Sequence, residues 1–195
     1  MTESASILVT NARLLTLSLA GAGDAPRRGS DLAKLGVFER GWILVREGRI
    51  VELGEGTPPA SDPKTRVIDA AGRVVMPAMV DCHTHACFLG NRHDEFEARL
   101  AGAGYLEILA AGGGIMSTVR SVREASETDL VDALRRRLEQ TARLGTGTIE
   151  VKSGYGLYPK TELKMLRAIQ TAGAESPQIV VPTFLGAHAL DSDAK

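Results

Sequence analysis

The segment 81–85, DCHTH, brings together side chains that bind metal ions. The chain has four histidines, and two of them, His83 and His85, lie here directly after the apolar run 74–80. Side chains on a β-strand alternate between its faces, so both imidazoles are expected on one face together with Asp81. Two neighbouring imidazoles can bind one metal ion, and parallel α/β folds place their active sites at the carboxyl ends of strands. The segment therefore predicts part of a metal site.

Two other interpretations of the histidine pair stay open. Two histidines at a strand end can be polar residues that leave the core and bind nothing. Cys82 and Cys87 could also join the pair in a zinc knuckle, although strand alternation places Cys82 on the face opposite His83. Two cysteines so close together are too few for the disulfide framework of a secreted protein, so both thiols are expected to be reduced.

Composition places the chain among soluble globular proteins. Of its 195 residues, 44% are hydrophobic and 24% are charged, and the formal net charge is −1. Such a small net charge gives no electrostatic reason to bind nucleic acid or an anionic membrane. The first apolar residues follow no basic segment, and Asn11 and Arg13 interrupt them well short of a membrane span. We therefore expect a cytoplasmic protein with neither nucleic-acid nor membrane partners.

The pattern changes near Pro77, which divides the chain into two predicted domains. Residues 1–76 are expected to form a small β domain with a first strand inside 6–17. The two-residue turn at 47–48 lies between apolar segments and predicts a β-hairpin, and a further extended pair is expected within 67–76.

Residues 77–195 alternate between apolar strands and amphipathic helices, which predicts a parallel sheet covered by helices. The expected elements are a strand at 79–83, a helix at 126–145, a strand at 146–151, a helix at 161–172 and a strand at 178–185. Ser126 is the predicted N-cap of the first helix, with Asp129 at its third helical position. The fold class is therefore α/β.

Three polar or glycine-rich segments carry no predicted chemistry. Arg135-Arg136-Arg137 is expected on a solvated helix face, and so are Glu95, Glu97 and Arg99. The run 112–114, GGG, lacks the Lys and Ser/Thr of a phosphate-binding loop and is expected to end a helix.

Five segments of the chain resemble a known family. GRVVMPAMVDCHTH is similar to the first barrel strand of the amidohydrolase superfamily, which comprises metal-dependent hydrolases built on a (β/α)8 barrel. NRHDEFEARLAGAGYLEILAAGGGIMSTV, EVKSGYGL, TELKMLRAI and TFLGAHA resemble the imidazolonepropionase family within it. The resemblance implies the N-terminal part of a (β/α)8 amidohydrolase barrel preceded by a small β-sandwich-like domain.

The same resemblance implies an activity and a set of residues. These enzymes hydrolyse 4-imidazolone-5-propanoate to N-formimidoyl-L-glutamate in histidine degradation, with one zinc or iron ion. His83 and His85 match the family's metal ligands, and Arg92, Tyr155 and His188 match its substrate-binding residues. The match of Arg92 fits its chemistry, since a guanidinium grips a carboxylate with two parallel hydrogen bonds.

The length of the chain sets a further expectation. A complete (β/α)8 barrel needs eight strands and about 250 residues. The chain is therefore similar to the N-terminal part of a larger enzyme and is expected to be inactive and not stably folded by itself. The family's acid–base groups lie in its later half, so no catalytic residue is assigned in this part. Lys152 lies on an earlier strand than the lysine that bridges two metals in some relatives, so one metal is expected.

Two alternative functions stay open at this point. The chain could belong to another amidohydrolase, such as a deaminase of a heterocycle, or it could be a non-catalytic metal-binding module. The expected partner is a small-molecule substrate, and a homodimer of the full enzyme is left open.

Overall fold

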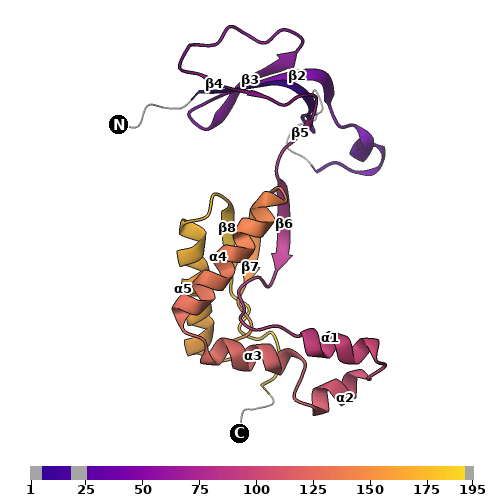
Figure 1. Cartoon of the computed structure of the whole chain (residues 1–195), viewed down its shortest axis with the longest axis vertical. Coiled ribbons are helices and arrows are strands. Elements are labelled where there is room, and N and C mark those ends of the chain that lie inside the picture. Colours follow the sequence, from indigo (N-terminus) through magenta and orange to yellow (C-terminus); the bar gives the residue numbers. More distant parts are fainter. Residues whose placement is uncertain (1–5, 19–25, 192–195) are drawn as a thin grey trace. The chain divides into compact units, whose positions relative to one another are not determined.

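The computed structural model describes residues 6–18 and 26–191 and divides the chain into two compact units, Met1–Pro77 and Ala78–Lys195 (Figure 1). Both helices and strands are present, so the predicted α/β class is confirmed in its broad form. Within the described ranges, no helix is both long and apolar enough to cross a membrane.

The first unit is one sheet whose strands follow the order β3-β2-β1-β4, with β5 also paired to β1. Its elements are β1 (Ile7–Leu15), the 3-10 helix η1 (Gly29–Ala33), β2 (Val37–Arg46), β3 (Arg49–Glu55), β4 (Arg66–Asp69) and β5 (Val74–Val75). Leu8, Trp42 and Leu44 form a small buried cluster on this sheet.

The predicted hairpin is present as β2 and β3, which pair antiparallel. Its turn residues Glu47 and Gly48 have φ of 53° and 72°, as a two-residue hairpin turn with positive φ at both positions requires. The expected extended pair differs from a hairpin, because β4 and β5 both pair parallel with β1. The link between them runs along β1, and the Gly72 N–H donates to the Asn11 carbonyl at 2.7 Å.

The second unit contains three parallel strands in the order β6-β7-β8, which confirms the predicted parallel sheet. Its elements are β6 (Met79–Thr84), α1 (His93–Leu100), α2 (Tyr105–Ala110), α3 (Ile115–Glu124), α4 (Glu127–Arg143), β7 (Thr146–Lys152), α5 (Pro159–Ala174) and β8 (Ile179–Thr183). The helices α1 to α3 fill the connection between β6 and α4. The sequence predicted that a helix ends near 112–114 but gave no bounds for any helix in this connection. The strand β8 ends two residues before the predicted Leu185, where the chain turns into a loop.

Helices α4 and α5 pack side by side, α4 against β7 and α5 against β8 (Figure 1). Leucines at helical spacing on α4 meet apolar residues of α5 and β7, and the large buried side chains of this core include Leu130, Leu134, Leu138, Met165, Ile169, Ile149 and Val151. The start of α4 is fixed by Ser126, whose side chain accepts the Asp129 N–H at 3.1 Å, as the capping pattern predicted. This core covers one face of β7 and so fixes the position of the strand.

Cys87 lies inside this core, shortly after the histidine pair. The residue is 0% exposed, and burial raises the pKa of its thiol to about 12. The thiolate is the reactive form of cysteine, so Cys87 is a structural residue.

Arg137 departs from the predicted solvated face. Its guanidinium donates to the carbonyls of Ala86 and Phe88 at 3.1 and 2.7 Å and lies 3.6 Å from the centroid of the Phe88 ring. The prediction is wrong for this residue because position 137 is three residues after the buried Leu134 and so lies at the edge of the buried helix face. Arg137 thus ties the segment that follows the histidines to α4.

We expect Cys87 to resist alkylation in the folded protein. A Cys82→Ser variant isolates its thiol, which is protonated at mildly alkaline pH and enclosed by the core. Mass spectrometry after iodoacetamide treatment should find Cys87 unmodified in native protein and modified in concentrated guanidinium chloride. Rapid modification under native conditions would show that the residue is not buried.

We expect Arg137→Ala to lower the free energy of unfolding by about 1–3 kcal/mol, because two backbone carbonyls lose a charged donor. The matched control is Arg136→Ala, an exposed neighbour whose loss should change stability by less than about 0.5 kcal/mol. Urea denaturation of both variants, made from the complete natural reading frame, with hydrogen exchange at residues 86–88, measures the difference. Equal stabilities of the two variants would show that the hydrogen bonds from Arg137 to Ala86 and Phe88 do not stabilise the fold.

Candidate functional site

The two histidines of the DCHTH segment lie close together at the carboxyl end of β6. Their ring centroids are 5.8 Å apart, and the backbone N–H of His83 donates to Asp81 Oδ1 at 3.3 Å. The Nδ1 atom of His85 is shielded from solvent and has no hydrogen-bond partner in the structure. Because buried polar atoms are normally paired, this nitrogen is one that a bound ligand could satisfy.

Two further predicted residues join His85 from the neighbouring strands. His188, which follows β8, stacks on His85 with ring centroids 4.7 Å apart. Tyr155, which follows β7, lies 5.3 Å from His85 and 5.9 Å from His188 between ring centroids. The loops after all three parallel strands therefore contribute rings to one cluster, which consists of His83, His85, Tyr155 and His188.

The surroundings of His85 favour its neutral form. Burial lowers the pKa of its imidazole, and the neighbouring His188, His83 and Lys152 lower this pKa further, while Glu150 opposes them. A neutral imidazole is the form that binds a metal. His85 is thus held in the neutral form, which has a free ring nitrogen lone pair for a ligand.

The described residues offer a partial ligand set. Among residues 6–18 and 26–191, no group of three or more His, Cys, Asp or Glu side chains is arranged to hold a metal ion. The zinc knuckle is not formed, because Cys87 is buried in the α4–α5 core. Two imidazoles supply only part of a zinc or iron site, because a catalytic zinc ion usually has three protein ligands.

Arg92 begins α1 and is held by Glu95. Its Nε donates to Glu95 Oε2 at 2.8 Å, and Glu95 Oε1 accepts the Gly114 N–H at 3.0 Å. The expectation of a solvated Glu95 is therefore wrong, since its side chain is only 13% exposed, whereas Arg99 of the same helix is exposed. The glycine run lies just after the end of α2, in line with the expectation that it ends a helix, and its last residue precedes α3. No signal in the sequence distinguished Glu95 from its exposed neighbours.

Arg92 and Tyr155 line one cavity of about 450 Å³, together with Phe88 and Thr118. Tyr155 also belongs to the ring cluster, so it is shared by this cavity and by the cluster that contains His85. Burial raises the pKa of the Tyr155 hydroxyl, and Arg92 opposes this shift. The hydroxyl is therefore a protonated donor at neutral pH.

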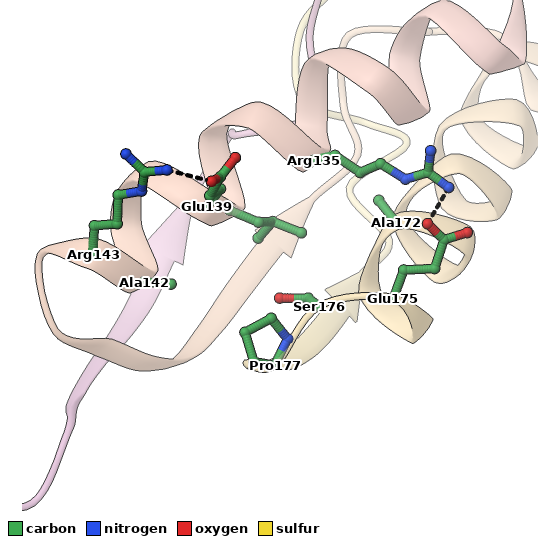
Figure 2. Close-up of a pocket in the computed structure, with 9 residues that line it drawn as sticks. Arg135, Glu139, Ala142, Arg143, Ala172, Glu175, Ser176 and Pro177 are labelled. Atoms are coloured by element: carbon green, nitrogen blue, oxygen red, sulfur yellow. Dashed lines mark hydrogen bonds and ion pairs between the residues drawn. The ribbon is translucent and has the colours of Figure 1, made fainter.

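A larger cavity of about 510 Å³ lies elsewhere, between the C-terminal halves of α4 and α5 (Figure 2). Its cations are already paired, Arg143 with Glu139 at 2.6 Å and Arg135 with Glu175. No histidine or tyrosine lines it. The chemistry of the ring cluster makes the smaller cavity the candidate site.

Glu162 was not among the predicted residues, although it shapes the loop that carries Tyr155. Its buried carboxylate accepts backbone N–H groups from Gly154, Gly156 and Leu157. The available signal was an acidic residue in the first turn of a helix directly after a glycine-rich loop, a pattern that occurs where carboxylates bind free N–H groups.

Among solved structures, the chain is similar to a crystal structure of 5-methylcytosine deaminase from Klebsiella pneumoniae liganded with 5-fluorocytosine. The TM-score is 0.56 at 15% identity, and the match covers 91% of this chain and 35% of that chain. Similarity at this level of identity shows a shared fold and nothing about activity.

Curated relatives match at much higher identity, although no protein-family model matches the chain. Imidazolonepropionase from Symbiobacterium thermophilum is 48% identical over 186 residues, covering 90% of this chain and 44% of the relative. Imidazolonepropionase from Herpetosiphon aurantiacus is 46% identical over 187 residues, covering 95% of this chain and 43% of the relative. The chain therefore spans less than half the length of the curated relatives it matches. Over nearly its whole length, it is similar in sequence to imidazolonepropionases.

Proposed function

We propose that this chain is part of an enzyme that hydrolyses 4-imidazolone-5-propanoate to N-formimidoyl-L-glutamate. The observation that carries the proposal is the convergence of His85, His188 and Tyr155 beside a cavity that Arg92 also lines. Relatives named imidazolonepropionase, at 43–49% identity, support it. Water adds to the ring carbonyl carbon of the substrate, and the ring C–N bond breaks.

The proposed architecture is the N-terminal part of a (β/α)8 barrel, residues 77–195, preceded by a small β-sandwich-like domain, residues 1–76. Three parallel strands joined through helices support the barrel, since that connection is its repeating unit. The ring cluster lies after the carboxyl ends of these strands, where barrel enzymes place their active sites.

One zinc or iron ion is proposed at the histidine pair, with His83 and His85 as ligands. The depressed pKa of His85 and its unpaired Nδ1 support this assignment. When bound, such a cation lowers the pKa of a coordinated water toward neutrality, from about 15.7 to roughly 7, and polarises a carbonyl that it faces.

Arg92 is proposed to bind the propionate of the substrate. A guanidinium pairs with a carboxylate through two parallel hydrogen bonds, and Glu95 already fixes its orientation. Tyr155 lines the same cavity as Arg92 and contacts His85, so a substrate bound at Arg92 has the ring cluster next to it. Holding the propionate thus places the ring at the ring cluster, which is a positioning effect on the reaction.

Tyr155 and His188 are proposed to hold the heterocycle. The protonated Tyr155 hydroxyl can donate a hydrogen bond to a ring nitrogen or carbonyl oxygen. The His188 ring stacks on His85, so a group that binds His188 also lies beside the proposed ligands. No residue of this chain is assigned as the acid–base catalyst.

The proposed partner is this small molecule alone, in the cytoplasm, and a homodimer of the full enzyme is left open. A heterocycle deaminase is the second candidate, and the fold shared with 5-methylcytosine deaminase is its support. A substrate panel on protein made from the complete natural reading frame separates the two. Loss of imidazolonepropanoate without ammonia release supports the proposal, and ammonia release from an aminated heterocycle instead would replace it.

We expect His83→Ala and His85→Ala each to weaken metal binding by more than about 100-fold, since loss of even an outer partner costs about 10- to 100-fold. Metal content after dialysis against a weak chelator provides the measurement. His93→Ala is the matched control for metal content, because His93 is an exposed histidine at the start of α1. Full metal occupancy in either of the first two variants would remove that residue from the ligand set.

We expect Arg92→Ala to raise KM and to lower kcat/KM by roughly 10- to 150-fold, the equivalent of about 1.5–3 kcal/mol for a hydrogen-bonded charge. Metal content should stay unchanged. The control is Arg99→Ala, an exposed arginine on the same helix that should leave both constants as they are. An unaltered KM in Arg92→Ala would place the carboxylate elsewhere.

A further inference from the structure

Glu162 is a buried carboxylate with unusual partners. The residue is 1% exposed and lies near the start of α5. Its Oε2 accepts the Gly154 N–H at 2.8 Å, and its Oε1 accepts the N–H groups of Gly156 and Leu157 at 2.7 and 2.8 Å. One side chain therefore binds three backbone donors from a single loop, and Tyr155 lies in the middle of that loop.

The loop is shaped to receive this carboxylate. Gly154 has φ of +113° and Leu157 has φ of +56°, so the backbone curls its N–H groups inward. A Cβ at Gly156 would lie 2.8 Å from Glu162 Oε1 and 2.6 Å from the Glu162 backbone nitrogen, so only glycine fits there. The shape of the loop therefore matches the position of the carboxylate. Because the Glu162 carboxylate is buried, the loss of any of its three hydrogen bonds would leave a buried polar group without a partner, which is destabilising.

The hydrogen bonds of Glu162 also fix how closely the 154–157 loop approaches His188. A Cβ at Gly154 would lie 3.1 Å from the Cβ of His188, so the loop backbone packs directly on that residue. A second bond closes the arrangement, because Ser153 Oγ accepts the Leu185 N–H at 3.0 Å. The position of the Tyr155 ring therefore follows from how Glu162 holds the residues on either side of it.

We infer that Glu162 is a positioning residue, which acts on the reaction by holding the Tyr155 ring against His85 and His188. The expected effect of Glu162 on turnover rests on the proposed function. The positioning of Tyr155 by Glu162 does not depend on any substrate. A carboxylate is needed because both of its oxygens accept. In glutamine the amide group would place a donor against one of the loop's N–H groups.

A double-mutant cycle tests the inference in protein made from the complete natural reading frame. Glu162→Gln and Tyr155→Phe are each expected to lower kcat/KM by about 3- to 10-fold, as loss of a hydrogen bond does. In the Tyr155→Phe background, Glu162→Gln should cost less than about twofold, because the hydroxyl that it positions is gone. Glu175→Gln is the matched control, an exposed glutamate at the end of α5 that should change nothing. Equal costs in both backgrounds, or no cost in either, would overturn the inference.

A second measurement needs no activity and applies to the gentler Glu162→Asp variant. In protein made from the complete natural reading frame with 3-fluorotyrosine incorporated, the ¹⁹F resonance of Tyr155 is assigned by its loss in Tyr155→Phe, and that of Tyr105 by its loss in Tyr105→Phe. The Tyr155 resonance should shift or broaden in Glu162→Asp while that of Tyr105 stays in place. An unmoved Tyr155 resonance would overturn the inference. If the wild-type protein does not turn over imidazolonepropanoate, the proposed function fails, and the ¹⁹F result still decides whether Glu162 positions Tyr155.

Discussion

The candidate site depends on the parallel register of β6, β7 and β8. Thr84 pairs with Val151, and Lys152 pairs with Thr183, so the three strands end level with one another. Residues that follow strands far apart in sequence thereby meet at one edge. A slip of one residue would turn each strand's side chains to the opposite face. The register is secured by side chains as well, since Thr84 Oγ donates to the Glu150 carbonyl at 2.6 Å.

Charged side chains hold the loops that this register brings together. Arg137 binds the carbonyls after β6, Glu162 binds the N–H groups after β7, and Glu95 binds both Arg92 and the N–H before α3. In each case a group from a helix satisfies backbone atoms that no strand or helix can pair. Such bonds are strong because one partner is charged, and they replace the regular hydrogen bonds that loops lack. The rings of the site are thus placed by helices that take no part in the chemistry.

Local sequence patterns predicted the elements well where one segment decided its own structure. The turn at 47–48 and the Ser126 cap need only their immediate neighbours, and both are present. Pairing across the chain could not be predicted in the same way, since nothing in 66–75 shows that both strands there pair with β1. The bounds of the short helices α1 and α2 were not predicted, because six to eight residues hold too few apolar positions to display a period.

The residues of the candidate site also fall into those that local sequence patterns predicted and those that depend on contacts between distant segments. The spacing of His83 and His85 indicated a shared face, since strand alternation is a local rule. Glu162 was not predicted, because a glutamate in a first helical turn is usually solvated and only the curled loop shows what it binds. The same holds for Arg137, whose role depends on a segment about fifty residues away. Residues that do chemistry are revealed by type and spacing, whereas residues that position them are revealed by tertiary contacts.

The two proposed ligands differ in how firmly the protein holds them. His85 is enclosed by His188 and Tyr155, and burial keeps its imidazole neutral, so its ring is fixed before any cation arrives. His83 is exposed, and its backbone N–H donates a hydrogen bond to the Asp81 carboxylate. A cation at this pair therefore gains its geometry from His85, while His83 must lose side-chain freedom on binding. Tyr155 packs against His85, so a residue that positions Tyr155 also limits the movement of the His85 ring. The carboxylate of Glu162 therefore influences the proposed metal ligand His85 as well as the proposed substrate contact Tyr155.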